Sequence, residues 1–164
     1  MKTIVLICLM GFLPILAIAQ EEATIEVAEP EYFRYGAGFQ STFPAWGLSG
    51  MMAVTDEVDL QLILGPFGGL STYAARGLYT FRDNDFWDLY GYGMLGVWNH
   101  STLRVRNETV LGFGVGGGIQ YDWRVFNDEL PPLFWNLELG FGRVNFDYYD
   151  FNSVMLGTGV HYRF

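Results

Sequence analysis

His100 and Ser101 are the residues whose types come nearest to a catalytic pair in this chain. A histidine can act as general base for a serine nucleophile, with a carboxylate such as Glu108 orienting the imidazole. The two residues are adjacent, however, so in a strand their side chains would point to opposite faces. We therefore expect a polar loop tip at this position, and an enzyme is the alternative.

A second group of polar side chains recurs at alternate positions, among glycines. An ionised side chain is costly to bury unless it is paired, so pairs such as Arg76 with Glu138 are expected to fill a crowded interior. A selective path for ions is the alternative. The predicted interior set is Arg34, Arg76, Gln120, Asp122, Glu138, His161 and Arg163.

The glycine-rich run 112–118 has the Gly-any-Gly spacing of some phosphate-binding loops. Such a loop needs a helix N-terminus directly after it, and none is visible here. The run instead predicts close packing against Tyr or Arg from facing strands, with a small ligand or lipid chain as the alternative occupant. There is neither a histidine cluster nor a calcium-loop spacing, so we predict no metal and no cofactor.

Composition sets the class of protein. Of the 164 residues, 51% are hydrophobic and only 16% are charged, whereas a water-soluble domain carries about a quarter charged residues. The 9 basic and 18 acidic residues give a net charge of -9, which excludes nucleic acid as a default partner because phosphate binding needs clustered Lys and Arg. The many aromatic residues exclude a disordered chain.

The first residues have the pattern of an export signal. Lys2 gives a positive start, an apolar run follows over 4–16, and Ala17-Ile18-Ala19 offers a cleavage site. The run is shorter than the ~20 residues of a transmembrane helix. We predict a signal peptide over 1–19, a solvated leader over 20–30 and one domain over 31–164. The single cysteine, Cys8, leaves with the signal peptide, so the mature chain has no disulfide.

The rest of the chain alternates with a period of two, which indicates strands rather than helices. In the last stretch, Val154, Leu156 and Val160 share one face, while Met155 and His161 share the other. Turn residues separate about eight such stretches. They lie near 31–43, 46–54, 58–66, 71–81, 86–98, 109–123, 134–145 and 153–164.

Three features favour a closed barrel in a membrane over a soluble sandwich. The polar faces are mostly glycine, as a narrow closed barrel demands. The opposite faces carry large apolar residues, and aromatic residues gather at the ends of the stretches, as in membrane-interface girdles. The stretch 86–98 has aromatic residues on both faces. The predicted girdles are Trp87, Tyr121, Trp123, Phe134, Trp135, Tyr162 and Phe164 at one level, and Phe43, Trp46, Phe67, Tyr73, Trp98, Tyr148, Tyr149 and Phe151 at the other.

The chain thus resembles the small eight-stranded outer-membrane barrels of Gram-negative bacteria, the OmpX/OmpA type. The most specific element of the resemblance is the final stretch, which ends in Tyr162-Arg163-Phe164. The resemblance implies that Val160, Tyr162 and Phe164 form the signal read by the outer-membrane assembly machinery. It also implies an all-β fold, a single antiparallel transmembrane barrel with both termini in the periplasm. The implied partners are outer-membrane lipids, that machinery and periplasmic chaperones.

The expected function is a structural or surface role in the bacterial outer membrane, without catalysis. Short connections argue against host binding, since adhesive members of the class carry long outer loops. A narrow, porin-like channel or a conduit for small hydrophobic molecules is the first alternative. The second is a lipid A-modifying enzyme, although the adjacent His100 and Ser101 depart from the His-any-Ser spacing of such deacylases.

Overall fold

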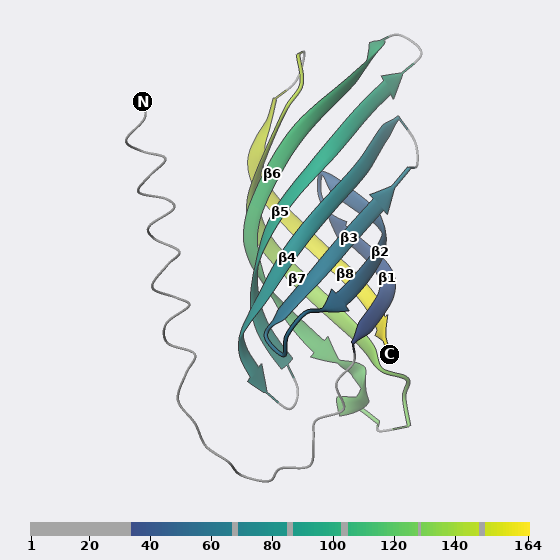
Figure 1. Cartoon of the computed structure of the whole chain (residues 1–164), viewed down its shortest axis with the longest axis vertical. Coiled ribbons are helices and arrows are strands. Elements are labelled where there is room, and N and C mark those ends of the chain that lie inside the picture. The colour runs from purple at the N-terminus through teal and green to yellow at the C-terminus, as the bar shows by residue number, and fades with distance from the viewer. Residues whose placement is uncertain (1–33, 67–68, 85–86, 103–104, 128, 148–149) are drawn as a thin grey trace, which may run out of the picture. The chain divides into compact units, whose positions relative to one another are not determined.

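The computed structural model describes residues 34–66, 69–84, 87–102, 105–127, 129–147 and 150–164. The predicted signal peptide (1–19) and leader (20–30) lie outside the described residues. No helix within the described ranges is long and apolar enough to cross a membrane. The elements are β1 (Tyr35–Thr42), β2 (Ala45–Ala53), β3 (Val58–Gly65), β4 (Leu70–Asn84), β5 (Trp87–Thr102), β6 (Val105–Asp122), the short 3₁₀ helix η2 (Trp123–Val125), β7 (Leu133–Asn145) and β8 (Asp150–Arg163) (Figure 1).

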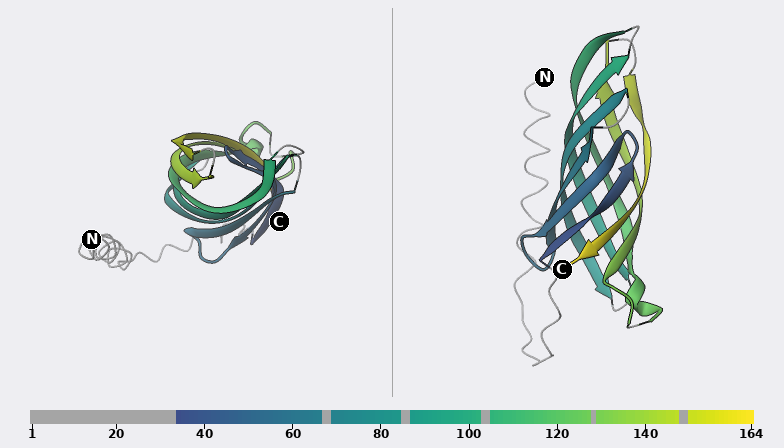
Figure 2. Two further views of the ribbon diagram at one scale, coloured as in Figure 1. Left: turned by 90° about the horizontal axis from the view of Figure 1, so that it is seen from above. Right: turned by 90° about the vertical axis from the view of Figure 1, so that its right-hand side faces the viewer.

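The eight strands of the described chain form one closed antiparallel barrel, as predicted. Each strand pairs with the next in sequence, and β1 pairs with β8 to complete the ring (Figure 2, left). At the seam, Tyr35 and Phe164 exchange two backbone hydrogen bonds of 2.9 and 2.8 Å. Closure satisfies the backbone groups of what would otherwise be two open sheet edges, which lipid cannot do.

The strands follow the predicted stretches but several are longer. β4 continues to Asn84, β5 continues to Thr102, β6 begins at Val105 and β8 begins at Asp150. These extensions carry mostly polar residues, so the apolar alternation that marks a strand in the sequence ends before the strand does. The β5–β6 hairpin also rises above its neighbour, because β6 pairs with β7 only from Gly112 onward.

The barrel has two ends, which we call the terminal end and the distal end. The terminal end carries Tyr35 and Phe164 together with the connections that follow β2, β4 and β6. The distal end carries the connections that follow β1, β3, β5 and β7 (Figure 1). Every strand therefore runs between these two ends, and inward positions can be ordered along the lumen from one end to the other.

The outer face of the barrel is apolar. Large side chains such as Leu62, Leu95, Leu139 and Leu156 are between 57% and 71% exposed. A contiguous apolar surface of this kind is rare on a water-soluble monomer and normal on a barrel that faces lipid. The alternation thus directs the bulky apolar residues outward and leaves the polar residues and most glycines inside.

The girdle prediction is partly wrong, because three of its aromatic side chains point into the barrel. Trp98 is 0% exposed, and Phe134 and Phe151 are each 7% exposed. Each follows the inward parity of its strand, so aromatic type alone did not indicate the face. Phe67, Tyr148 and Tyr149 lie outside the described residues. At the terminal end, ring contacts on the outer face join Tyr35 to Phe164, Tyr162 to Phe164, and Tyr121 to Trp135.

Candidate functional site: the polar lumen

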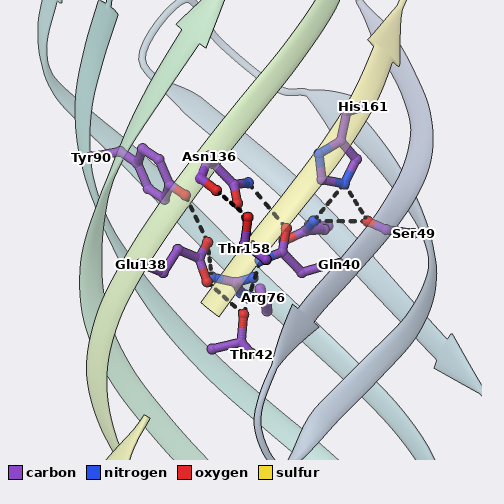
Figure 3. Close-up of polar contacts among 10 residues, drawn as sticks. Gln40, Thr42, Ser49, Arg76, Tyr90, Asn136, Glu138, Thr158 and His161 are labelled. Carbon is purple, nitrogen blue, oxygen red and sulfur yellow. Dashed lines mark hydrogen bonds and ion pairs between the residues drawn. The ribbon is translucent and has the colours of Figure 1, made fainter. Parts of the chain in front are cut away.

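A buried ion pair crosses the middle of the lumen. Arg76 on β4 and Glu138 on β7 lie on strands that do not pair with each other, and alternation turns both side chains inward. Arg76 Nη2 lies 2.7 Å from Glu138 Oε1, and both side chains are 0% exposed (Figure 3). Since a buried charge needs a partner and hydrogen bonds, the remaining contacts decide whether the pair is satisfied.

Glu138 is fully engaged. Tyr90 Oη donates to Glu138 Oε1 at 2.7 Å, and Thr42 Oγ1 donates to Glu138 Oε2 at 2.6 Å (Figure 3). Hydrogen bonds to an ionised acceptor are about twice as strong as neutral ones. The carboxylate therefore receives donors from β4, β5 and β1, and so braces three parts of the wall against β7.

Two amides extend this network along the wall. Asn136 Nδ2 donates to Gln40 Oε1 at 3.0 Å, while Gln40 Nε2 donates to Thr42 Oγ1 at 2.9 Å. Gln40 is 0% exposed and Asn136 is 2% exposed. The guanidinium of Arg76 also lies over the ring of Tyr92, with Cζ 4.0 Å from the centroid, which is within the range of a cation–π contact.

A second buried cluster joins β2, β3 and β8 on the terminal side of the ion pair. Gln61 Nε2 donates to Ser49 Oγ at 2.7 Å and lies 3.2 Å from His161 Nε2. His161 Nε2 is also 3.0 Å from Ser49 Oγ. When Nε2 accepts from the Gln61 amide, the proton of the neutral imidazole is on Nδ1. Figure 3 shows His161 and Ser49 beside the central network.

Three glycines on β6 each leave space for one aromatic ring in the lumen. A Cβ on Gly116 would lie 2.7 Å from Tyr92 Cζ, and a Cβ on Gly118 would lie 2.6 Å from Tyr90 Cζ. Toward the distal end, a Cβ on Gly112 would lie 2.8 Å from the ring of Trp98. These distances are too short for real contacts, so the glycine run is a packing feature, as its sequence suggested.

The structure brings some of the predicted interior residues together and separates others. Arg76, Glu138 and His161 lie in the two buried clusters, and Gln120 donates to Asp88 at 3.2 Å nearer the terminal end. Arg163 pairs with Asp59 at 2.8 Å. Two predicted residues lie apart from the lumen clusters: Arg34 is exposed just before β1, and Asp122 pairs with Arg124 at the start of η2.

Several network residues were absent from the predicted set. Inward parity in the sequence points to Gln40, Gln61 and Asn136, which occupy alternate positions among glycines and apolar residues. Tyr90 and Tyr92 gave no such signal, because both faces of β5 carry large side chains. Only the facing glycines of β6, which are brought alongside by pairing, show that the tyrosines turn inward.

Around His100, the structure describes strand-pairing and packing contacts. His100 and Glu108 are opposite partners in the β5–β6 pairing, and the His100 ring meets Phe146 edge-on at 6.2 Å. The backbone N–H of Asp147 donates to the Glu108 carboxylate. The side chain of Ser101 lies outside the described residues. Among the residues that are described, no group of three or more His, Cys, Asp or Glu is placed to hold a metal ion.

Comparison with known proteins supports the same fold. No protein-family model and no curated protein matches the chain. The N-terminal β-barrel domain of Pseudomonas aeruginosa OprF is 17% identical, covers 79% of this chain and 95% of its own, and has a TM-score of 0.58. Neisserial surface protein A is 14% identical, with 79% and 93% coverage and a TM-score of 0.52. The Yersinia pestis outer membrane protein Ail is 16% identical, with 79% and 97% coverage and a TM-score of 0.42.

The class of protein follows from the fold and the surface together. The chain is an eight-stranded barrel of the outer-membrane type. Its exterior is apolar, its interior contains a buried polar network, and aromatic side chains form a girdle at the terminal end. This arrangement is that of a protein spanning the bacterial outer membrane.

Proposed function

We propose that this chain serves as a closed, non-catalytic barrel with a structural or surface role in the outer membrane. The observation that carries the proposal is the buried Arg76–Glu138 pair, whose carboxylate is already bound by Tyr90 and Thr42. Side chains that bond to one another across the lumen leave it braced rather than open. An eight-stranded barrel is just wide enough for such filling.

The proposed orientation places the terminal end in the periplasm. Two features support it: an even strand number puts the start of β1 and the end of β8 at one end, and Phe164 closes the outer-facing terminal girdle with Tyr35 and Tyr162. Lipids of the outer membrane then cover the apolar exterior. The assembly machinery and periplasmic chaperones would act on the chain before the barrel closes, with Val160, Tyr162 and Phe164 as the proposed recognition signal.

The proposal is tested by comparing cells that have and lack the protein. Cells that lack this outer-membrane protein should be more sensitive to detergent, and the wild-type gene should restore their resistance. The purified barrel should show heat-modifiable migration on detergent gels and no steady conductance in planar bilayers. The same cells should have lipid A of unchanged mass.

Each readout separates one alternative. Steady conductance of the wild-type protein would replace the structural role with the channel. A change in lipid A mass that is abolished by His100→Ala would replace it with the enzyme. Recovery of the protein from the soluble periplasmic fraction would contradict the membrane location itself.

A further inference from the structure

The lumen changes character along its axis. On β5, the inward residues Met94 and Trp98 lie on the distal side of Tyr92 and Tyr90. On β3, Ile63 lies on the distal side of Gln61. The order differs on β4 and β7, where the apolar side chains of Leu78 and Phe134 are buried on the terminal side of Arg76 and Asn136. Distal to the polar clusters, the buried side chains are apolar except for Thr72. The apolar ones are Ala45, Ile63, Ala74, Met94, Trp98, Val144, Phe151 and Met155.

The apolar layer at the distal end is tightly packed. A Cβ on Gly114 would lie 2.6 Å from Met155 Cε and 3.1 Å from Met94 Cε. Trp98 is 0% exposed, and its Nε1 donates to the Pro44 carbonyl at 3.1 Å. The β1–β2 turn is thereby held against the lumen side chains. Apolar surfaces at this packing density exclude water.

The polar half contains buried atoms that require further partners. Among the described residues, six buried side-chain atoms form no hydrogen bond within the protein. Native proteins satisfy such atoms with ordered water when the surroundings are polar. All six lie on the terminal side of the apolar layer. They are Gln61 Oε1, Arg76 Nε and Nη1, Tyr92 Oη, His161 Nδ1 and Arg163 Nε.

These atoms follow a route inward from the terminal end. The Arg163–Asp59 pair is 17% and 16% exposed, so solvent reaches it. His161 and Gln61 come next, in contact with each other. Gln61 is then the direct cross-strand partner of Arg76, which places an acceptor without a partner beside donors without partners.

We propose that the lumen is a blind, hydrated vestibule, which admits water and small ions from the terminal end and is sealed by the apolar layer at the distal end. In this proposal the apolar layer around Trp98, Met94 and Met155 forms the seal. The Arg76–Glu138 pair lies on the hydrated side of that layer. This inference goes beyond the proposed structural role. It concerns access to the lumen, and it is compatible with the structural role and with the enzyme but not with a conducting channel.

Thiol accessibility tests the vestibule directly. The native chain has a single cysteine, so a Cys8→Ser background gives clean single-thiol variants. Ser49→Cys probes the polar half and Ala74→Cys probes the apolar layer. Ser49 and Ala74 are each 5% exposed, so the comparison is matched for burial. The refolded barrels are treated in lipid vesicles with Ag⁺, and thiols left unreacted are counted after unfolding.

We expect the thiol of Ser49→Cys to react at least about tenfold faster than that of Ala74→Cys, because a thiol reacts only where the reagent and water reach it. Equal rates, or faster reaction at Ala74→Cys, would overturn the vestibule. Heat-modifiable migration identifies folded samples. If Ala74→Cys does not fold, Ala45→Cys, whose parent side chain is 0% exposed in the same layer, takes its place.

Removal of the seal gives a second readout. Trp98→Ala removes one of the two side-chain donors to the Pro44 carbonyl, and it opens space beside Thr72, which is the other donor. Vesicles with a pH-sensitive dye inside should lose an imposed proton gradient faster with Trp98→Ala than with wild type. Trp135→Ala, which removes an indole from the outer face, should hold the gradient as wild type does. A folded Trp98→Ala barrel that holds the gradient equally well would contradict the assignment of the seal.

Discussion

Tyr90 and Gly118 are opposite partners in the β5–β6 pairing, and the tyrosine ring occupies the space that a side chain at position 118 would need. From that position the phenol reaches over Gly118 and donates to Glu138, the partner of Gly118 on β7. Tyr92 and Gly116 repeat the relationship one step toward the distal end. The hydrogen bond from Tyr90 to the central ion pair therefore depends on a glycine at position 118.

Substitution of Gly118 by alanine tests this dependence. The new methyl group would lie 2.6 Å from the Tyr90 ring, so the ring must move and its hydrogen bond to Glu138 must weaken. We expect a loss of about 1–3 kcal/mol in the free energy of unfolding, as for other overpacked sites. Denaturant unfolding of the refolded barrel measures it.

Gly93→Ala is the matched control, because no atom lies within 4 Å of a Cβ at Gly93. A change in stability of at most ~0.5 kcal/mol is expected for this exposed site. Equal destabilisation by both variants would show that backbone freedom, and not the tyrosine, explains the glycine at position 118.

The central ion pair predicts a strongly non-additive result. Glu138→Gln removes one charge and leaves Arg76 unpaired inside the barrel, at a cost of about 3–5 kcal/mol. Arg76→Met leaves the opposite charge and should cost a similar amount. The double variant removes both charges and should be more stable than either single variant. A double-mutant cycle on unfolding free energies measures the coupling, and additive effects would contradict a paired, buried state.

The apolar exterior predicts that a charge is costly only within the band that faces lipid. Leu139→Arg places a charge at an outward position that is 60% exposed, and should cost about 2–4 kcal/mol if this position lies near the bilayer midplane. Phe126→Arg is the control, since Phe126 is 81% exposed after η2 and outside the strands. Refolding yield and stability in vesicles compare the two. Equal tolerance would favour a water-soluble barrel.

The recognition signal predicts a difference between cells and vesicles. Phe164→Ala should reduce the amount of heat-modifiable barrel in cell membranes, while the purified variant refolds in vesicles nearly as wild type does. Tyr35→Ala removes the ring that contacts Phe164 across the seam at 6.3 Å and should leave assembly in cells intact. Similar losses for both variants in cells would indicate that the girdle contact, rather than a signal, is required.

The architecture was predictable because the alternation is local. A period of two, with glycines on one face and large apolar residues on the other, indicated eight antiparallel strands and a closed barrel, and both are confirmed. The strand ends were less predictable. Beyond the apolar band, hairpins such as β5–β6 continue with polar residues, and pairing rather than hydrophobicity keeps them extended.

The side chains that line the lumen were predictable only where the alternation of their own strand shows which residues point inward. Arg76 and Glu138 stand out because their own strands turn them inward. Trp98 was misplaced because an aromatic ring suits a girdle and a packed interior equally well. Tyr90 depends on glycines that lie more than twenty positions away in sequence, so only the paired register reveals its direction.

The ladder of glycines on β6 has a consequence for how this sequence can vary. At two successive levels of the lumen, the paired strands share one volume: the phenol of Tyr90 or Tyr92 on β5 occupies the space left by Gly118 or Gly116 on β6. Enlarging one partner requires shrinking the other, because the tyrosine ring already fills the space beside each of these glycines. Substitutions inside the barrel should therefore be tolerated in compensating pairs across neighbouring strands, while the lipid face, which packs against a fluid, accepts changes one residue at a time.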